Sequence, residues 1–230
     1  MIVLENVSKQ FKLRGGGHKT ILSNVSIKLP DKNLAILGPN GAGKSTTLRM
    51  ISGVENVDSG RVIHQLDMSW PIGFRGSFHK MLTGVENVRF VARMYGRNTE
   101  YVVEYVKEFA ELGSFFYEPI RTYSSGMMAR LGFGTSMAID FDCYLVDELM
   151  SVGDASFRQK SKKVFKQKLK KSRLIMVSHS MKDLKTFCDS GILLTNGTMT
   201  YFENIDDAIS EYEKMVKKPK KQGNKHKQSK

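Results

Sequence analysis

Hydrophobic and polar residues alternate along two segments near the N-terminus, IVLENVS at 2–8 and ILSNVSIKL at 21–29. A period of two residues places every second side chain on the same face of an extended strand. One buried face and one solvated face are typical of antiparallel sheets. We therefore expect the chain to begin with half-buried antiparallel strands.

The period changes in the middle of the chain, at YVVEYVKEFAEL over 101–112. Apolar residues recur there at spacings of three and four, which places them on one face of a helix. Gly113 follows as a helix stop. We expect a packed helix whose buried face carries Tyr101, Val102, Tyr105, Val106, Phe109 and Leu112.

Two short apolar runs further on, CYLVD at 143–147 and RLIMVS at 173–178, are typical of strands buried on both faces. A helix-like segment at 154–170 separates them. Strand, helix and strand in this order form the βαβ unit of a parallel sheet. The chain is therefore predicted to be α/β, with a mixed or parallel core sheet, an N-terminal antiparallel β-subdomain and an inserted helical subdomain.

The composition is that of one globular unit, because 230 residues with 40% hydrophobic residues support one sizeable core. No apolar run reaches the length of a transmembrane helix, and the strand-like start after Met1 is not a secretory signal. Cys143 and Cys188 lie far apart in apolar surroundings, which favours core residues in a reducing compartment over a disulfide. The five histidines are scattered without the spacing of a zinc site.

The net charge of +13 raises the question of an anionic partner. About half of this positive charge lies in the C-terminal tail. The tail 217–230 holds seven lysines and no acid, so we expect a disordered basic arm. A second basic run, 158–173, has a narrow apolar stripe of Val164, Phe165 and Leu169 that faces the core. Solvated surface and attraction to anionic lipid both remain open. Nucleic acid ranks third, because aromatic residues for base stacking are not interleaved with these lysines.

The clearest chemical motif is LAILGPNGAGKSTTLRMISG at 34–53, where an apolar strand leads through a glycine loop into a helix. The loop matches G-x-x-x-x-G-K-[ST], a phosphate-binding pattern. In this interpretation Gly41 and Gly43 let backbone N–H groups face a β-phosphate, Lys44 neutralises phosphate oxygens and Ser45 ligates Mg²⁺. A glycine-rich turn that merely precedes a helix is the alternative. We expect a nucleoside triphosphate site made by Gly38, Pro39, Asn40, Gly41, Ala42, Gly43, Lys44, Ser45 and Thr46.

Two acids, Asp147 and Glu148, end the apolar strand in FDCYLVDE. An acid at the C-terminal end of a parallel strand lies beside such a loop, so Asp147 is expected to hold Mg²⁺ through water. Glu148 is the candidate base that polarises the attacking water. His179 follows the strand RLIMVS and is expected to reach the γ-phosphate. The alternatives are a strand that simply ends in polar residues and a structural histidine.

A second helix start that favours an anion lies in TYSSGMMAR at 122–130. Two serines and a glycine precede a helix whose first N–H groups lack partners. One fold cannot aim both sites at the same phosphate. If two copies pack head to tail, the Ser124 hydroxyl and Gly126 N–H of one copy close over the γ-phosphate held by the other. The alternative is an ordinary serine N-cap.

These motifs, in this order, resemble the ATP-binding cassette ATPases from Met1 to about Met215. The resemblance implies that Phe11 stacks on adenine, that GPNGAGKS is the Walker A motif and that YLVDE is the Walker B motif. It implies that YSSGM is the signature, with Ser124, Ser125 and Gly126 against the nucleotide. It also implies that Asp154 belongs to the D-loop and that His179 is the switch histidine. ATP and Mg²⁺ are the implied cofactors.

Two departures from the family pattern affect this site. The usual signature is Leu-Ser-Gly-Gly-Gln, whereas Tyr123, Ser125 and Met127 stand at three of its positions. The glutamine of the family's Q-loop is replaced by His79 in SWPIGFRGSFHKMLTG. The resemblance then implies that His79 touches Mg²⁺ or the attacking water beneath the membrane subunit. An exposed loop histidine is the alternative.

Several segments are similar to the polysaccharide-exporting branch of the family: SWPIGF, LTGVENVRF, YSSGM, FDCYLVDE and VGDASFR. The resemblance implies a peripheral ATPase at the cytoplasmic face of the bacterial inner membrane. It implies a homodimer that is bound to polytopic membrane subunits and handles the polysaccharide only indirectly. O-antigen and teichoic acid members often carry an added C-terminal domain, and the chain ends soon after ENIDDAISEYEKMV, so we expect the capsular type.

Two alternatives to this function stay open. One is the ATPase of an O-antigen or teichoic acid exporter, and the other is a soluble cassette regulator bound to nucleic acid or ribosomes. The predicted domains are the cassette at 1–216, with the Q-loop and helical subdomain at about 75–135, and the basic tail at 217–230.

Overall fold

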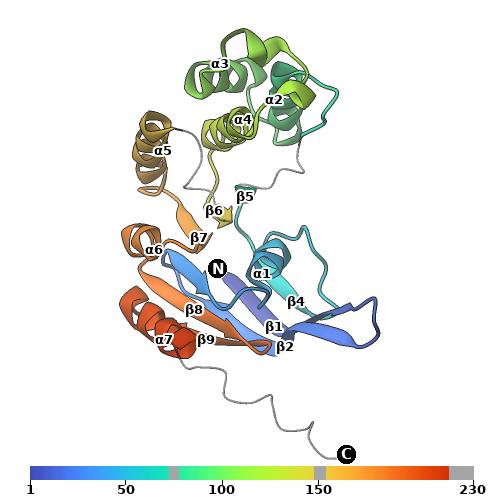
Figure 1. Cartoon of the computed structure of the whole chain (residues 1–230), viewed down its shortest axis with the longest axis vertical. Helices are drawn as coiled ribbons and strands as arrows, with labels where there is room; N and C mark the ends of the chain where they lie inside the picture. Colours follow the sequence, from blue (N-terminus) through green and yellow to red (C-terminus); the bar gives the residue numbers. More distant parts are fainter. Residues whose placement is uncertain (73–77, 148–153, 218–230) are drawn as a thin grey trace, which may run out of the picture.

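The computed structural model describes residues 1–72, 78–147 and 154–217. Two sheets form one end of the molecule, and a group of helices lies at the other end of the long axis (Figure 1). The first sheet has three strands in the order β2-β1-β4: β1 (Ile2–Lys12), β2 (His18–Leu29) and β4 (Ser59–His64). Both pairings of β1 are antiparallel, which confirms the prediction from the alternating N-terminal segments.

The second sheet has six strands in the order β5-β6-β7-β3-β8-β9. Its strands are β3 (Leu34–Leu37), β5 (Met68–Ile72), β6 (Cys143–Asp147), β7 (Arg173–Val177), β8 (Ser190–Thr195) and β9 (Thr198–Phe202). All neighbours are parallel except β8 and β9. The helix α5 (Ala155–Lys168) lies between β6 and β7 in the chain, which confirms the predicted βαβ unit.

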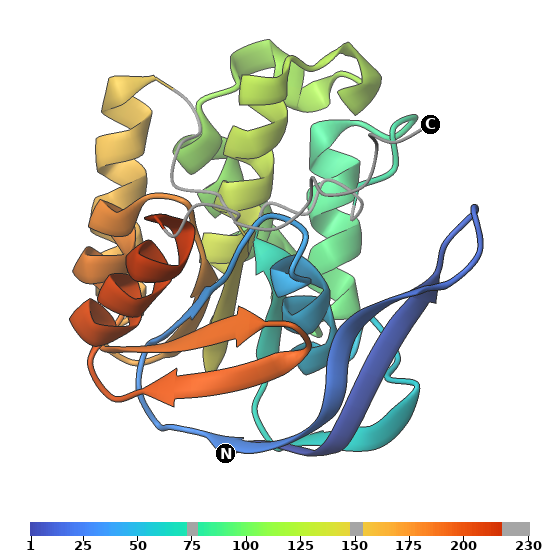
Figure 2. The same cartoon turned by 60° about the horizontal axis from the view of Figure 1, so that its bottom comes forward.

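Both faces of the six-stranded sheet are buried. Leu34 and Ile36 of β3 face one apolar cluster, and Ala35 and Leu37 face the other. The first cluster fills the space between the two sheets and includes α1 (Lys44–Ile51), which Figure 2 shows next to the strands of the first sheet. The second cluster joins the opposite face of the sheet to the other helices. This burial explains why the core strands read as continuous apolar runs.

The helical insertion follows β5 and precedes β6. Its elements are α2 (Gly84–Met94), α3 (Thr99–Ala110), the 3-10 turns η2 (Gly113–Tyr117) and η3 (Ile120–Thr122), and α4 (Ser125–Ala138). The insertion therefore places α4, which begins inside the predicted signature, at the opposite end of the molecule from the first sheet (Figure 1).

The predicted helix at 101–112 is confirmed, with two corrections. Val102, Val106 and Phe109 are buried as expected, but Tyr101 is 61% exposed, because its side chain lies beyond the edge of the packed face. The helix ends at Ala110, since Glu111 adopts a left-handed conformation with φ 53°.

An aromatic cluster joins the helical insertion to the core sheet. The ring centroids of Trp70 in β5 and Tyr95 lie 5.2 Å apart, and Tyr95 caps the end of α2. Phe141, just before β6, lies 5.6 Å from Trp70 and 5.5 Å from Tyr95, edge to face in both contacts. Aromatic pairs at such distances are favourable beyond their buried area. The chain thus enters and leaves the insertion beside one shared contact.

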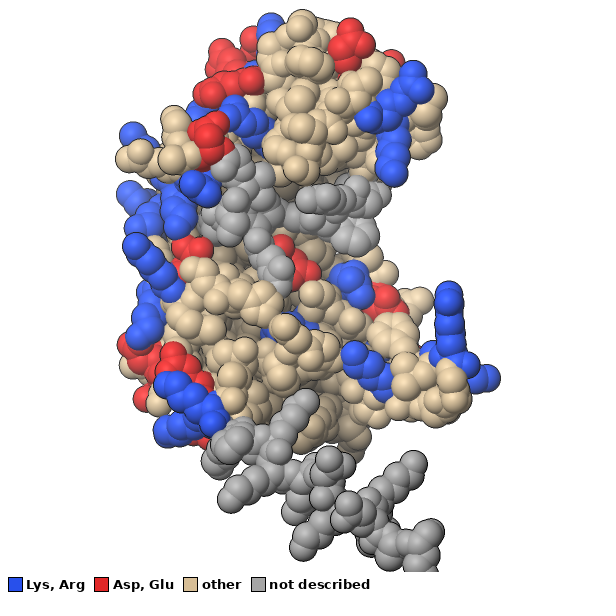
Figure 3. Space-filling model, viewed as in Figure 1, with Lys and Arg blue, Asp and Glu red and all other residues tan. Residues whose placement is uncertain are grey.

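Lysines and arginines gather along the side of the molecule where α5, α6 (Met181–Phe187) and α7 (Ile205–Lys217) lie (Figure 3). The predicted apolar stripe of α5 reaches the core through Phe165, which is fully buried. Three α5 lysines pair with acids of other segments: Lys160 with Glu111, Lys162 with Asp183 and Lys168 with Asp140. Part of the basic run is therefore neutralised within the protein.

The C-terminal helix α7 packs against β8 (Figure 2). It continues through Lys217, one residue beyond the boundary predicted for the cassette, and the rest of the predicted tail lies outside the described residues. Among the helices that the structure describes, none has both the length and the apolar character needed to cross a membrane. Cys143 and Cys188 are buried as predicted, and burial raises the pKa of the Cys143 thiol to about 12.

Candidate functional site

The loop between β3 and α1 is shaped by glycines that no other residue can replace without strain. Gly38, Gly41 and Gly43 have positive φ values of 154°, 78° and 102°. A Cβ at Gly38 would lie 2.4 Å from the Leu194 carbonyl oxygen, and one at Gly43 would lie 2.4 Å from the Ile21 side chain. The backbone therefore takes the curved path that the phosphate-binding pattern predicts.

Lys44 begins α1 and is held inside this loop. It is buried, and its Nζ donates to the carbonyl oxygens of Gly38 at 2.9 Å and Pro39 at 3.2 Å. The loop thus folds around the amine, close to the first N–H groups of α1. A buried cation next to a helix N-terminus gives the loop a concentrated positive potential.

The loop borders a cavity of about 410 Å³. Its lining combines the predicted loop with residues of β2 and the segment after β7: Lys19, Ile21, Asn40, Gly41, Gly43, Lys44, Ser45 and His179. The structure therefore brings His179 to the loop, and its predicted contact with the γ-phosphate stays a prediction. Of the remaining predicted loop residues, Pro39 contacts Lys44, while the Thr46 hydroxyl accepts from Arg49.

Parallel strands bring Asp147 to the edge of the sheet at which the glycine loop begins. Asp147, the last residue of β6, pairs in register with Val177, the last residue of β7, and β7 in turn neighbours β3. A small cavity lined by Gly38, Lys44 and His179 among others confirms that the ends of β3 and β7 meet there. Asp147 is half-buried at this edge. The predicted base Glu148 lies outside the described residues.

Phe11, the predicted contact to adenine, lies on the strand pair next to this arrangement. Phe11 is 38% exposed near the end of β1, with the Lys9 amine 5.1 Å from its ring centroid. Its cross-strand partner is Lys19. The Lys19 amine lies close to the glycine loop, since a Cβ added at Gly41 would be 3.3 Å from it. The β1–β2 pair thus brings the Lys19 amine to the cavity, and the Phe11 ring is exposed on the neighbouring strand.

The sequence prediction did not include Lys19. Its signal was its place on the strand that returns from Phe11 through the glycines at 15–17.

His79 is not among the residues that line the cavity, and its side chain is exposed. Its backbone is fixed by the buried Asn87, whose Oδ1 accepts from the His79 N–H at 2.7 Å and whose Nδ2 donates to the His79 carbonyl oxygen at 3.2 Å. The same amide donates to the Leu82 and Thr83 carbonyls. The role predicted for the His79 side chain thus stays a prediction.

The predicted signature forms the start of α4. Ser124 is the N-cap, and its Oγ accepts from the Met127 N–H at 3.2 Å, while Ser125 is the first helical residue. The Tyr123 hydroxyl donates to the Phe115 carbonyl oxygen at 2.6 Å, and burial raises the pKa of Tyr123 to about 12. The segment is therefore anchored just before the serines, so that the helix start is presented at the surface.

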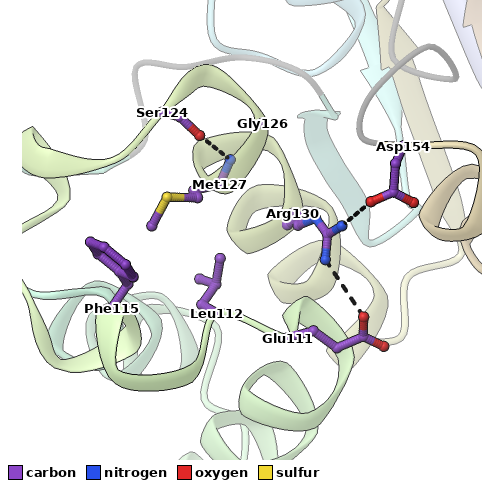
Figure 4. Close-up of a pocket in the computed structure, with 8 residues that line it drawn as sticks. All are labelled: Glu111, Leu112, Phe115, Ser124, Gly126, Met127, Arg130 and Asp154. Atoms are coloured by element: carbon purple, nitrogen blue, oxygen red, sulfur yellow. Dashed lines mark hydrogen bonds and ion pairs between the residues drawn. The ribbon is translucent and has the colours of Figure 1, made fainter.

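A second cavity, of about 630 Å³, lies at this helix start (Figure 4). Its lining combines apolar and charged side chains: Glu111, Leu112, Phe115, Ser124, Gly126, Met127, Arg130 and Asp154. Asp154 is the N-cap of α5 and accepts from the Phe157 N–H at 2.9 Å. Among the described residues, none lines both this cavity and the one at Lys44. Within one chain, the two predicted phosphate-binding segments therefore line separate cavities.

Comparison with protein families gives a match to the ABC transporter model over residues 22–151. The matched region begins in β2 and spans the glycine loop, the helical insertion and β6.

Two curated proteins are similar over nearly the whole chain. The polysialic acid transport ATP-binding protein KpsT of Escherichia coli is 49% identical, and the alignment covers 92% of this chain and 96% of that protein. The capsule polysaccharide export ATP-binding protein CtrD of Neisseria meningitidis serogroup B is 45% identical, with coverage of 92% and 98%.

A solved structure of the ATP-binding cassette MJ0796, a dimer in a post-hydrolysis state bound to ADP and Pi, has a TM-score of 0.76 to this chain. The match covers 89% of this chain and 99% of that chain at 21% sequence identity. At this identity, the likeness supports the fold alone.

Proposed function

The chain belongs to the ABC transporter family, and on that premise we propose that it is the ATP-hydrolysing subunit of a bacterial exporter of capsular polysaccharide. The observation that carries the proposal is the loop between β3 and α1, in which left-handed glycines surround the buried Lys44 amine. The printed names of the two relatives, one for polysialic acid transport and one for capsule polysaccharide export, support the substrate class.

The described residues provide the elements of a triphosphate site. The Lys44 amine lies against the loop, where it donates to the carbonyl oxygens of Gly38 and Pro39, so it is placed to form charge-assisted hydrogen bonds with an incoming phosphate. The N–H groups of the loop and of the first turn of α1 add donors on the same side. Phe11 stacks on adenine at the mouth of the cavity. ATP is therefore bound by backbone donors, one buried cation and one exposed ring.

Mg²⁺, when bound, neutralises charge on the phosphate oxygens. The Ser45 hydroxyl and the Asp147 carboxylate would hold it, and both supply the oxygen donors that this ion prefers. The His79 imidazole supplies nitrogen and does not line the cavity, so it does not fit a place among the Mg²⁺ ligands. We retain for His79 only the role of reporting the nucleotide state to the membrane subunit.

Hydrolysis needs a base and a group that stabilises charge on the transferred phosphate. Glu148 follows Asp147 directly, and we assign it the polarisation of the attacking water. His179 lines the same cavity as the loop and is assigned to the γ-phosphate. The signature of a second copy, through Ser124 and Gly126, completes the site in a head-to-tail homodimer. The separate cavities of the single chain support this arrangement.

The assembly that follows from this proposal lies at the cytoplasmic face of the inner membrane. Two cassettes bind polytopic membrane subunits, and closure on ATP moves those subunits, which contact the polysaccharide. The cassette itself handles the polymer only indirectly, and nucleic acid is not a proposed partner.

The test is genetic and biochemical. Deletion of the gene in its source bacterium is expected to leave capsular polymer inside the cell. A wild-type copy is expected to restore surface polymer, and Lys44→Ala is not. In detergent, the tagged chain should copurify with a polytopic partner. Normal surface polymer in the deletion strain would overturn the assignment to capsule export. Absence of ATP hydrolysis by the purified wild-type complex would overturn the assignment of ATPase activity.

A further inference from the structure

Arg130 of α4 lies between two carboxylates that come from different segments (Figure 4). Its guanidinium donates to the Asp154 carboxylate at 2.5 Å and pairs with the Glu111 carboxylate at 3.5 Å. Asp154 begins α5, and Glu111 caps the end of α3. The arginine therefore links three helices at the rim of the signature cavity.

The surroundings of Arg130 restrict its orientation. The side chain is 19% exposed, and its guanidinium carbon lies 4.6 Å from the centroid of the Phe157 ring. Glu111 is itself held by the Lys160 amine at 2.5 Å. A planar guanidinium that stacks on a ring and pairs with carboxylates on two sides fixes both the distance and the orientation of those carboxylates relative to it. Both carboxylates are more than half exposed, so the ion pairs add little to fold stability, and the contact is better suited to positioning.

We propose that Arg130 is a positioning residue that holds the start of α4 and the start of α5 in one orientation, so that Ser124 and Asp154 meet the second copy as a single surface. The inference rests on the proposed function, because it concerns closure of the ATP-bound dimer. It explains why a cavity next to a predicted anion site contains two acids: they hold the arginine in place. The Phe157 N–H and Arg130 keep the pKa of Asp154 below its usual value, so the carboxylate stays charged at neutral pH.

The competing role for Arg130 is direct contact with the phosphate of the second copy. The two roles predict opposite effects at Asp154. If Arg130 positions the surface through Asp154, removal of that carboxylate weakens closure. If Arg130 binds phosphate, removal of the carboxylate frees the guanidinium and tightens closure.

The experiment uses the full chain with Glu148→Gln, in which slow hydrolysis preserves the ATP-bound dimer. Into this parent we introduce Arg130→Met, which keeps an apolar side chain on Phe157, and Asp154→Asn, which keeps an N-cap but removes the charge. The double variant completes the cycle. Lys107→Met is the matched control, because Lys107 pairs with Glu104 on the exposed side of α3. Sedimentation with and without ATP gives the dimer dissociation constant.

Each single variant is expected to raise the dimer dissociation constant about tenfold, and the double variant no further than either single variant. Arg130→Met should bind a fluorescent ATP analogue as the parent does at concentrations where the chain is monomeric. Its thermal midpoint should stay within a few degrees of the parent. Lys107→Met should match the parent in all three measurements.

Three results would overturn the inference: unchanged dimerisation of Arg130→Met, tighter dimerisation of Asp154→Asn, or additive losses in the double variant. All three presuppose a parent that dimerises with ATP. A parent that stays monomeric with bound ATP would instead contradict the dimer on which the proposed function depends.

Discussion

The two segments that we propose to bind phosphate are built in opposite ways. At the glycine loop, the backbone is held in conformations that only glycine adopts freely, and the Lys44 amine is buried against the loop carbonyls. At the signature, Ser124 is an ordinary N-cap, and an ideal Cβ at Gly126 would meet only the Ser124 hydroxyl, at 3.8 Å. The first segment is rigidly shaped, whereas the second is open.

This difference indicates which segment is able to bind a phosphate without a second copy of the chain. In the proposed function, the loop contributes the buried Lys44 amine and its own backbone donors, so we expect it to bind a phosphate without help from another chain. The signature cavity is lined by Arg130 together with Glu111 and Asp154, so the charges around it do not favour a free anion. A phosphate whose charge is already balanced by the loop of a second copy is the better occupant. We therefore propose that the open segment is half of a site.

Lys44→Ala tests the rigid side of the comparison and should have the largest effect. We expect ATP hydrolysis to fall at least about a hundredfold, because the variant removes the charge that faces the transferred phosphate. Steady-state phosphate release measures it. Lys28→Ala is the matched control, an exposed lysine of β2 that does not line the cavity. Turnover of Lys44→Ala near the wild-type rate would contradict the site assignment.

Mixed dimers test whether the open segment, the signature, acts on the nucleotide bound by the second copy. Lys44→Ala and Ser124→Arg should each be inactive alone. In a mixed dimer both lesions fall in the same composite site if the signature acts on the second copy, and the other site stays intact. Mixtures should then regain part of the wild-type ATPase activity. The control is each variant mixed with itself at the same total concentration. ATPase activity in either of these single-variant controls would contradict the arrangement.

A pair of glycine substitutions compares the two segments directly. Gly43→Ala should destabilise the protein by about 1–3 kcal/mol, since φ is 102° and the added Cβ would lie 2.4 Å from the Ile21 side chain. Gly126→Ala should leave stability unchanged or raise it by about 1 kcal/mol, because Gly126 is helical and uncrowded. Denaturant unfolding measures both. Equal losses in the two variants would contradict the contrast.

Lys19→Met should have the smallest effect. The Lys19 amine lies at the mouth of the cavity beside Gly41, and exposed charge pairs contribute about 0.2–1 kcal/mol, so we expect ATP binding to weaken a few-fold. The loss should shrink as salt rises. Titration with a fluorescent ATP analogue checks it, with Lys28→Met as the control on the same strand. A salt-independent affinity equal to the wild type would exclude a contact with phosphate.

The sequence was sufficient for the glycine loop because its pattern is contiguous and each residue type has a local physical reason. The order of strands and helices was also predictable, since the apolar runs at 143–147 and 173–178 show no polar face. Tyr101 was assigned wrongly, because periodicity gives the face of a helix but not how far the neighbouring elements extend over it.

Lys19 and Arg130 were not predictable by the same reasoning. Lys19 reaches Gly41 only because β1 and β2 pair so that Phe11 stands opposite Lys19, and Arg130 meets Asp154 across 24 residues of sequence. Such contacts depend on tertiary arrangement, which no local pattern contains. The ion pairs that accompany the signature are therefore a result of the structure alone.

The aromatic cluster between the core sheet and the helical insertion has a practical consequence. Trp70 is the chain's one tryptophan, and its ring packs against Tyr95 and Phe141 where the two parts of the fold meet. Indole emission is sensitive to the distance and angle of such neighbours and to the entry of water. Rotation of the insertion on the core would therefore change the intrinsic fluorescence, and the protein carries its own optical reporter of that motion without an added label.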